Sequence, residues 1–172
     1  VPWAYEAIST LADRGIINGR SDELFEPNDT VTREEFVKIC VNICGLDSSD
    51  KTVVFSDEVS EEWYTGYLKA AYDSGLVRGR DDGTFGIGEP VSRQDMAVIL
   101  YNIIKAHIDS VKEPQNKFDD AEIISEYAKD AVSCLSELGI INGTGDNLFS
   151  PLDTATRAEA AKMAFGILEY VK

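Results

Sequence analysis

A set of glycine, phenylalanine and arginine residues recurs three times along the chain at fixed spacings. Four residues after a first glycine comes a second, ten residues after it a phenylalanine, and eighteen after it an arginine. An aromatic residue stands twelve positions before each first glycine. The three sets are Trp3, Gly15, Gly19, Phe25 and Arg33; Trp63, Gly75, Gly79, Phe85 and Arg93; and Tyr127, Gly139, Gly143, Phe149 and Arg157. Such agreement over four positions in three copies indicates one supersecondary unit used three times.

Each copy has the pattern of a helix followed by an ordered loop and a second helix. In the first copy, apolar residues from Trp3 to Ala12 recur at helical spacing. Gly15 then supplies the left-handed backbone that commonly ends a helix. The stretch from 19 to 31 contains turn-forming residues and is predicted to be a loop. We expect the rings of Phe25 and its two equivalents to be buried in the core and to anchor this loop there.

A capping box marks the start of the second helix in two of the copies. Thr32 and Thr156 supply the N-cap hydroxyl, and Glu35 and Glu159 follow three residues later. The remaining copy, the second along the chain, has Ser92 as its N-cap residue and the shorter Asp95 three residues later. Its return hydrogen bond to the N-cap backbone should therefore be weaker.

A single helix pair of this kind cannot bury its own apolar face, whereas three packed together can. We therefore predict an all-α protein in which three helix–loop–helix repeats pack as one pseudo-threefold helical bundle. The predicted repeats are 1–45, 46–106 and 107–172, called repeats 1, 2 and 3 below.

The charge balance excludes one large class of partners. The 172 residues include 16 Lys and Arg against 31 Asp and Glu, a formal net charge of −15. Such a chain lacks the basic face that nucleic-acid binding requires. No apolar run approaches the roughly 20 residues of a membrane helix, and no signal-peptide pattern is expected at the start. Hydrophobic residues make up 44% of the chain, enough for a genuine core.

No standard catalytic or metal-binding constellation is present, so we predict neither an enzyme nor a cofactor or metal site. We expect Cys40, Cys44 and Cys134 to fill the core, as buried cysteines usually do. Calcium binding at Asp81-Asp82-Gly83 is a weaker alternative, because this run lacks the alternating oxygen ligands of an EF-hand loop.

Two interpretations of Arg33, Arg93 and Arg157 compete. Each is either a surface charge or ion pair of little energetic value, or part of an anion-binding site. A cation at the first position of a helix opposes the helix dipole, yet the sequence places one there in all three repeats. Free N–H groups at a helix start attract anions, and an arginine adds a planar fork for a carboxylate or phosphate. We favour the anion site.

The combined motifs resemble the S-layer homology domain. In repeat 1 they are Gly15-Ile16-Ile17-Asn18-Gly19, Phe25-Glu26-Pro27 and Thr32-Arg33-Glu34-Glu35, with close copies in the other repeats. Phe55-Ser56-Asp57 and Phe118-Asp119-Asp120 match the opening of the family's unit. The resemblance covers essentially the whole chain.

This resemblance implies a non-enzymatic anchor that binds an anionic, pyruvylated secondary cell-wall polysaccharide attached to peptidoglycan, in grooves between repeats. It implies an extracellular place in the cell wall or S-layer of a Gram-positive bacterium, and fusion to a larger surface protein or enzyme. The alternative is a structural module that assembles a surface lattice without binding glycan directly.

The resemblance also implies which residues bind the glycan. Arg33, Arg93 and Arg157 would engage its acid group, beside Thr32, Ser92 and Thr156. Close backbone approach is expected at Gly19, Gly79 and Gly143. Trp3, Trp63 and Tyr127 would stack on sugars or, alternatively, pack in the core. Asp57 and Asp120 would accept sugar hydroxyls or, alternatively, cap helices.

The repeats differ at several of these positions, so the three grooves are predicted to be unequal. Repeat 2 has Ser92-Arg93-Gln94-Asp95 in place of the common motif, and Ile87 where the others have proline. Repeat 3 has Tyr127 in place of tryptophan, and Thr144 where the others have Arg20 and Arg80.

Overall fold

The computed structural model describes residues 1–21, 24–108 and 117–171. Its six α-helices are α1 (Tyr5–Asp13), α2 (Arg33–Cys44), α3 (Thr65–Asp73), α4 (Arg93–Ile104), α5 (Lys129–Glu137) and α6 (Arg157–Gly166). Three short 3-10 helices are η1 (Pro2–Ala4), η2 (Ala121–Ile123) and η3 (Glu126–Ala128). These described ranges contain isolated β-bridges but no strand. The predicted all-α class is confirmed.

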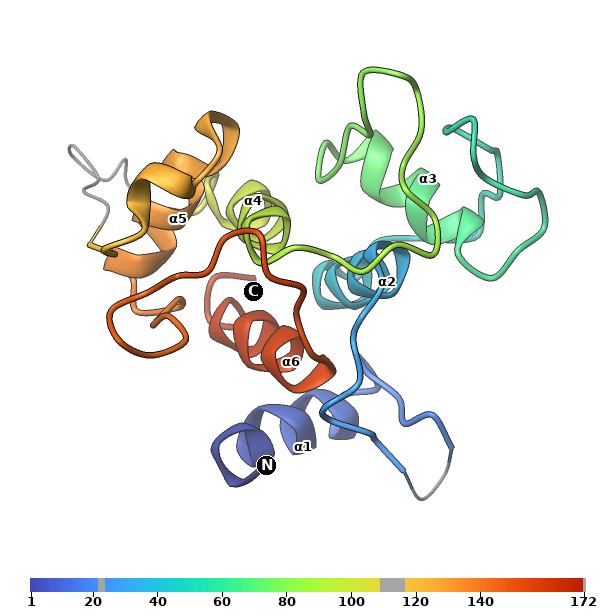
Figure 1. Ribbon diagram of the computed structural model, residues 1–172. Coiled ribbons are helices and arrows are strands. Elements are labelled where there is room, and N and C mark those ends of the chain that lie inside the picture. Colours follow the sequence, from blue (N-terminus) through green and yellow to red (C-terminus); the bar gives the residue numbers. More distant parts are fainter. Residues whose placement is uncertain (22–23, 109–116, 172) are drawn as a thin grey trace.

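The second helices of the repeats lie in the middle of the molecule and the first helices lie outside them (Figure 1). The closest helix pairs are α2 with α3, α4 with α5, and α6 with α1. The second helix of each repeat therefore packs against the first helix of the next repeat, and the α6–α1 pair closes the ring. This is why a repeat needs its neighbours to bury its apolar face.

A ring of backbone hydrogen bonds joins the repeats at the centre. The Val31 N–H donates to the Ala155 carbonyl at 3.1 Å, and Ala155 donates to Val91 at 3.1 Å. Val91 donates back to Val31 at 3.0 Å, and all three side chains are buried. A closed ring of equivalent bonds supports the expected pseudo-threefold arrangement, which itself stays a prediction.

The core confirms the loop prediction fully in two repeats and in part in the third. Phe85 and Phe149 are fully buried in the main cluster. Phe25 is only half-buried and packs on a smaller cluster beneath α1 and α6. Among the cysteines, Cys40 and Cys134 are buried and Cys44 is half-buried, all as free thiols. Burial raises the pKa of each thiol.

The helix ends follow the sequence signals. Gly15 has φ +69° after α1, and the N–H of Ile16 returns to the Leu11 carbonyl at 2.9 Å. Both bonds of the capping box are present at Thr32 and at Thr156. At Ser92 only the N–H of Asp95 is bound, at 3.2 Å. The Asp95 carboxylate is thus available for another partner. Within the described ranges, no helix has the length and apolarity to cross a membrane.

Candidate functional site: the grooves between repeats

The three motif arginines begin α2, α4 and α6, as predicted, but their side chains reach into the loop of another repeat. The Nε of Arg33 donates to the Phe85 carbonyl at 2.8 Å. Arg93 Nε donates to the carbonyl of Phe149 at 2.8 Å, and Arg157 Nε to that of Phe25 at 2.9 Å. Each guanidinium also lies over the ring of the same phenylalanine, 4.6–5.4 Å from its centroid. The arginines therefore join the repeats in a closed ring.

The remaining donors of the three arginines meet different partners. Arg33 forms an ion pair with Asp95 at 2.5 Å. Arg93 forms one with Glu159 at 2.9 Å and is 5% exposed. Arg157 instead donates from Nη2 to the Asn18 carbonyl at 2.8 Å. Among the described residues, no carboxylate lies within ion-pair distance of Arg157. The ion-pair interpretation thus describes Arg33 and Arg93, but not Arg157.

The electrostatic surroundings of Arg93 and Arg157 also differ. Burial lowers the pKa of Arg93, against the opposing effect of Glu159. Burial lowers the pKa of Arg157 as well, and there the nearby cation Arg20 lowers it further. Carboxylates raise the pKa of both arginines, but only Arg157 also has a cation, Arg20, among the charged neighbours that shift its pKa.

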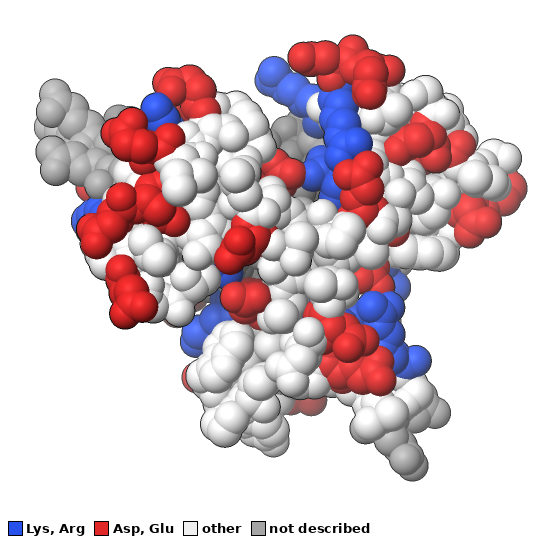
Figure 2. Space-filling model, viewed as in Figure 1, with Lys and Arg blue, Asp and Glu red and all other residues white. Residues whose placement is uncertain are grey.

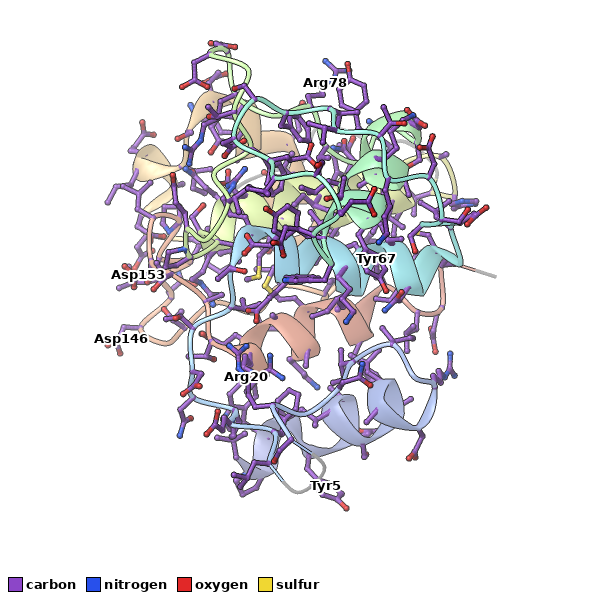
Figure 3. All side chains as sticks on the ribbon, turned by 90° about the vertical axis from the view of Figure 1, so that its right-hand side faces the viewer. Tyr5, Arg20, Tyr67, Arg78, Asp146 and Asp153 are labelled. Atoms are coloured by element: carbon purple, nitrogen blue, oxygen red, sulfur yellow. The ribbon has the colours of Figure 1, made fainter. Side chains whose placement is uncertain are left out.

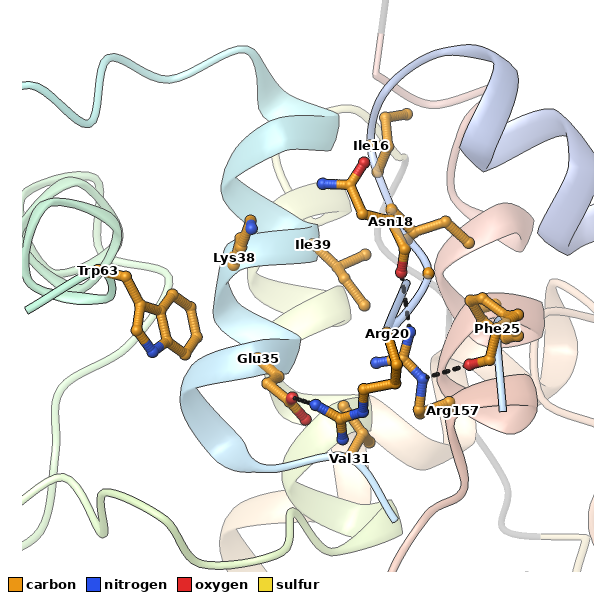
Figure 4. Close-up of a pocket in the computed structure, with 13 residues that line it drawn as sticks. Ile16, Asn18, Arg20, Phe25, Val31, Glu35, Lys38, Ile39, Trp63 and Arg157 are labelled. Atoms are coloured by element: carbon orange, nitrogen blue, oxygen red, sulfur yellow. Dashed lines mark hydrogen bonds and ion pairs between the residues drawn. The ribbon is translucent and has the colours of Figure 1, made fainter. Parts of the chain in front are cut away.

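A first cavity, groove 1, has a volume of about 280 Å³ and takes residues from all three repeats (Figure 4). Repeat 1 supplies its loop and one face of α2, repeat 2 supplies Trp63, and repeat 3 supplies Arg157. Glu35, Lys38 and Ile39 of α2 lie between Trp63 on one side and Arg157 on the other. The part of α2 that lines the groove thus carries both polar and apolar side chains, with an aromatic ring at one end of the groove and a guanidinium at the other.

A second cavity, groove 2, has a volume of about 810 Å³ and is built from equivalent positions. Arg33 stands where groove 1 has Arg157, and Tyr127 where it has Trp63. Asp95 replaces Glu35. The two grooves share no lining residue, and Arg20 and Arg78, one from each, lie well apart in the side view (Figure 3).

The basic side chains of this acidic chain gather locally. Acidic side chains are spread over the visible face, whereas Lys and Arg form a band between α4 and α3 (Figure 2). The cations that line groove 2 are Arg33, Arg78, Arg80 and Lys105, and those that line groove 1 are Arg20, Lys38 and Arg157. The positions equivalent in sequence in the remaining pair of repeats are Arg93, Thr144, Glu159 and Lys162, and groove 3 is used here as the name of this set of positions alone.

The three aromatic residues are exposed, so the core-packing alternative is wrong. Trp3 is 54% exposed, Trp63 is 47% and Tyr127 is 61%. The ammonium of Lys38 lies 5.6 Å from the Trp63 centroid. The Tyr127 hydroxyl donates to Asp95 at 2.7 Å. Trp63 lines groove 1 and Tyr127 lines groove 2, where an exposed ring presents a flat apolar face of the kind that sugars stack on.

Asp57 and Asp120 hold loops of their own repeats. Asp57 accepts the backbone N–H groups of residues 85, 86 and 87 at 2.7–3.0 Å. Asp120 accepts those of Phe149 and Ser150 at 2.9 and 2.7 Å. Neither side chain caps a helix, so that alternative is wrong. Burial opposes ionisation of Asp57, but the three N–H groups outweigh it and hold the pKa of this carboxyl below its usual range.

A family model described as the S-layer homology domain matches residues 1–37, 54–97 and 117–161. The chain belongs to the S-layer homology domain family. Its relatives include an amylopullulanase of Thermoanaerobacterium thermosulfurigenes and the exoglucanase XynX of Acetivibrio thermocellus, each 35% identical over 170 residues. The S-layer protein sap of Bacillus anthracis is 32% identical over 161 residues.

These alignments cover 97%, 97% and 93% of this chain, but only 9%, 16% and 19% of the respective relatives. In each relative the S-layer homology region is thus a small part of a larger protein. The three matched segments each fall within one predicted repeat, although the repeat boundaries themselves stay a prediction.

The recurring glycines of the S-layer homology motifs have local structural roles. A Cβ on Gly79 would lie 2.4 Å from the Phe55 ring, and one on Gly143 would lie 3.0 Å from Phe118. Gly19 is crowded by the carbonyls of Ser21 and Leu24. Gly19 and Gly79 also line grooves 1 and 2, so close approach of a ligand there stays a prediction.

The N-cap hydroxyls are engaged by their own helices. Thr32 accepts the Glu35 N–H, Ser92 that of Asp95, and Thr156 that of Glu159. Direct glycan contacts by these hydroxyls stay a prediction.

Sequence reasoning missed several cations of the grooves as site residues: Arg20, Lys38, Arg78, Arg80 and Lys105. Arg20 and Arg80 each follow the second glycine of their repeat, and this recurrence was the available signal. Lys38 recurs only as Lys162, since repeat 2 has Val98 there, and Arg78 and Lys105 have no basic equivalent in the other repeats.

The calcium alternative concerned Asp81-Asp82-Gly83. There the Asp82 carboxylate accepts the N–H and the hydroxyl of Thr84, at 2.9 and 2.7 Å. Across the described part of the chain, no three His, Cys, Asp or Glu side chains gather as a metal site.

Proposed function

We propose that the chain anchors a larger surface protein to the bacterial cell wall without a covalent bond. It does so by binding an anionic secondary cell-wall polysaccharide attached to peptidoglycan, in the grooves between repeats. The acid group, in this proposal a pyruvate ketal, is held by the motif arginines Arg33, Arg93 and Arg157. The location that follows is extracellular, in the cell wall or S-layer of a Gram-positive bacterium.

One observation carries the proposal. Groove 1 combines an exposed indole, a guanidinium and an ammonium in one cavity, in a chain whose net charge is −15. Aromatic walls suit sugar rings, and cations confined to a groove suit discrete acid groups. The acidic remainder of the surface disfavours non-specific adsorption to an anionic wall. The relatives, an S-layer protein, an amylopullulanase and an exoglucanase among them, suit an anchor fused to diverse partners.

Cosedimentation with purified cell walls tests this function. Walls from Bacillus or Acetivibrio strains are used intact and after acid extraction of the attached polysaccharide. We expect the chain to pellet with intact walls and to stay in the supernatant with extracted peptidoglycan. Equal pelleting with both preparations would contradict glycan recognition. Failure to pellet, together with concentration-dependent oligomers in sedimentation velocity, would favour the lattice-assembly alternative.

A further inference from the structure

The three grooves offer unequal sites for an acid group, and this inference rests on the function proposed above. We propose that groove 1 is the primary site, with the acid group of the glycan bound beside Arg157 and Arg20 and its sugar ring against Trp63. Grooves 2 and 3 are secondary because carboxylates of the chain itself neutralise their arginines.

In grooves 2 and 3 an internal carboxylate stands where the ligand acid would bind. Asp95 receives Arg33 on one oxygen and the Tyr127 hydroxyl on the other. Glu159 receives Arg93 on one oxygen and the Thr156 N–H on the other. A ligand acid at either arginine must displace this carboxylate or lie against it. Two like charges at contact distance repel strongly in a partly desolvated groove.

In groove 1 the corresponding carboxylate is diverted. Glu35 Oε1 binds Arg20 at 2.6 Å, and its Oε2 accepts the Thr32 N–H at 3.0 Å. Among the described residues, Arg157 therefore donates to the carbonyls of Phe25 and Asn18, which are neutral acceptors, and forms no ion pair. Its guanidinium can thus approach a ligand acid without displacing a paired carboxylate.

The neighbours of Arg157 strengthen the preference for an anion. After burial, Arg20 has the largest effect on the pKa of Arg157 and lowers it through repulsion between the two guanidinium groups, while Glu35, Asp29 and Glu26 raise it. An oxyanion placed near both cations relieves this repulsion. Among the described residues, the lining of groove 1 includes three cations, Arg20, Lys38 and Arg157, and one carboxylate, Glu35.

The far end of groove 1 suits the sugar that carries the acid. Trp63 is 47% exposed and lies across the face of α2 from Arg157 (Figure 4). Lys38 stands between them, 5.6 Å from both the Trp63 and the Tyr67 ring centroids. An aromatic face with a donor above it recognises a ring and its hydroxyl groups together. The class of ligand is therefore a glycan with a single oxyanion on or next to the sugar that meets Trp63.

Intrinsic fluorescence separates the grooves, because the chain has only two tryptophans. Trp63 lines groove 1, whereas Trp3 lies in η1, which packs against α6. The Trp3→Phe variant thus reports groove 1 alone, and Trp63→Phe reports the η1–α6 region alone. The probe is polysaccharide fragment released from walls that the wild-type chain pellets. We expect a saturable emission change in Trp3→Phe and none in Trp63→Phe.

A matched pair of arginines tests the electrostatic argument. The Arg20 and Arg80 side chains are equivalent in sequence and almost equally exposed, at 41% and 42%. Arg80 donates to Glu89 from both of its terminal nitrogens. We expect Arg20→Ala to raise the Kd for the fragment at least tenfold, and Arg80→Ala to raise it less than threefold. Circular dichroism confirms folding, and Arg14→Ala on the exposed end of α1 is the control for general charge loss.

The source of the oxyanion is distinguished by treating the fragment. Mild acid removes a ketal carboxylate, and cold hydrofluoric acid removes a phosphate ester. The treatment that weakens binding to the Trp3→Phe variant at least tenfold identifies the group. A response from Trp3 without one from Trp63, or a greater loss in Arg80→Ala than in Arg20→Ala, overturns the assignment to groove 1. Wall binding persists in these outcomes, so they are distinct from failure of the anchoring function.

Discussion

Arg93 and Arg157 occupy equivalent positions in two repeats, yet one is neutralised and the other is not. Arg93 is 5% exposed and pairs with Glu159, whereas the hydrogen-bond partners of Arg157 among the described residues are carbonyl oxygens. The difference begins at another position. Arg20 draws Glu35 away from Arg157, while repeat 3 has Thr144 there and leaves Glu159 to Arg93. A repeated motif thus fixes where an arginine lies, and its variable neighbours decide whether its charge is available.

Groove 1 also differs from the others in how its loop is held. Asp57 binds the loop of groove 2 and Asp120 that of repeat 3, beneath the rings of Phe55 and Phe118. Among the described residues, no carboxylate accepts the backbone N–H groups of residues 25 and 26. The half-buried Phe25 is held by Arg157 instead. The arginine available to a ligand is thus also the one that holds the loop of its own groove.

The largest expected effect would test whether Arg93 is mainly structural. Arg93→Ala should lower the free energy of unfolding by about 3–5 kcal/mol, because it breaks a buried ion pair. Arg157→Ala should lower it by about 1–2 kcal/mol, since it removes bonds to neutral acceptors only. Urea denaturation of both variants measures the difference. Equal losses would break the comparison, because Arg157 would then be as structural as Arg93.

The sequence predicted where the motif residues lie in their repeats, but not which residues they contact. The repeat spacing predicted the helices, the left-handed glycines and the arginines at the helix starts, because these depend on local backbone chemistry. The partners of the arginines could not be predicted, because they come from residues 52–139 positions away. The exposure of Trp63 and the loop-binding role of Asp57 likewise depend on which repeat packs on which. Local signals therefore predicted the helices and their ends, whereas tertiary packing determined which residues contact one another in the site.

The loop of groove 2 provides the next test. Gly75 and Gly79 have nearly equal φ, +75° and +76°, but a Cβ on Gly75 meets nothing within 4 Å. Gly75→Ala should cost about 1 kcal/mol, the ordinary penalty of a left-handed alanine. Gly79→Ala should cost about 2–3 kcal/mol, because its Cβ also meets the Phe55 ring and the loop must shift. Thermal unfolding of the two variants gives the comparison, and similar losses would mean that Phe55 does not fix this loop.

A pH series sharpens the difference in loop support. The pKa of Asp57 is held below its usual value, so its stabilisation is present above about pH 4 and is lost as pH falls through the folded pKa. Asp57→Asn should lower the free energy of unfolding by about 1–2 kcal/mol at pH 7. The gap between variant and wild type should narrow at pH 3. Urea denaturation at both pH values measures it, with exposed Asp81→Asn as the control. A gap that is unchanged at pH 3 would refute the role of the carboxylate.

The smallest effect concerns the internal acid of groove 2. Burial, followed by the hydrogen bond to Asp95, raises the pKa of Tyr127 to about 12. In NMR spectra of ring-labelled tyrosine, the Tyr127 resonance should keep its phenol position at pH 11, and Asp95→Asn should make it titrate earlier. Tyr127→Phe should cost no more than about 1 kcal/mol, since the ring is largely exposed. Asp95 accepts hydrogen bonds from both Tyr127 and Arg33. An unchanged Tyr127 titration in Asp95→Asn would therefore mean that this carboxylate does not bind these two side chains in solution. Groove 2 would then offer a free arginine, and the distinction between it and groove 1 would rest on Arg20 and Lys38 alone.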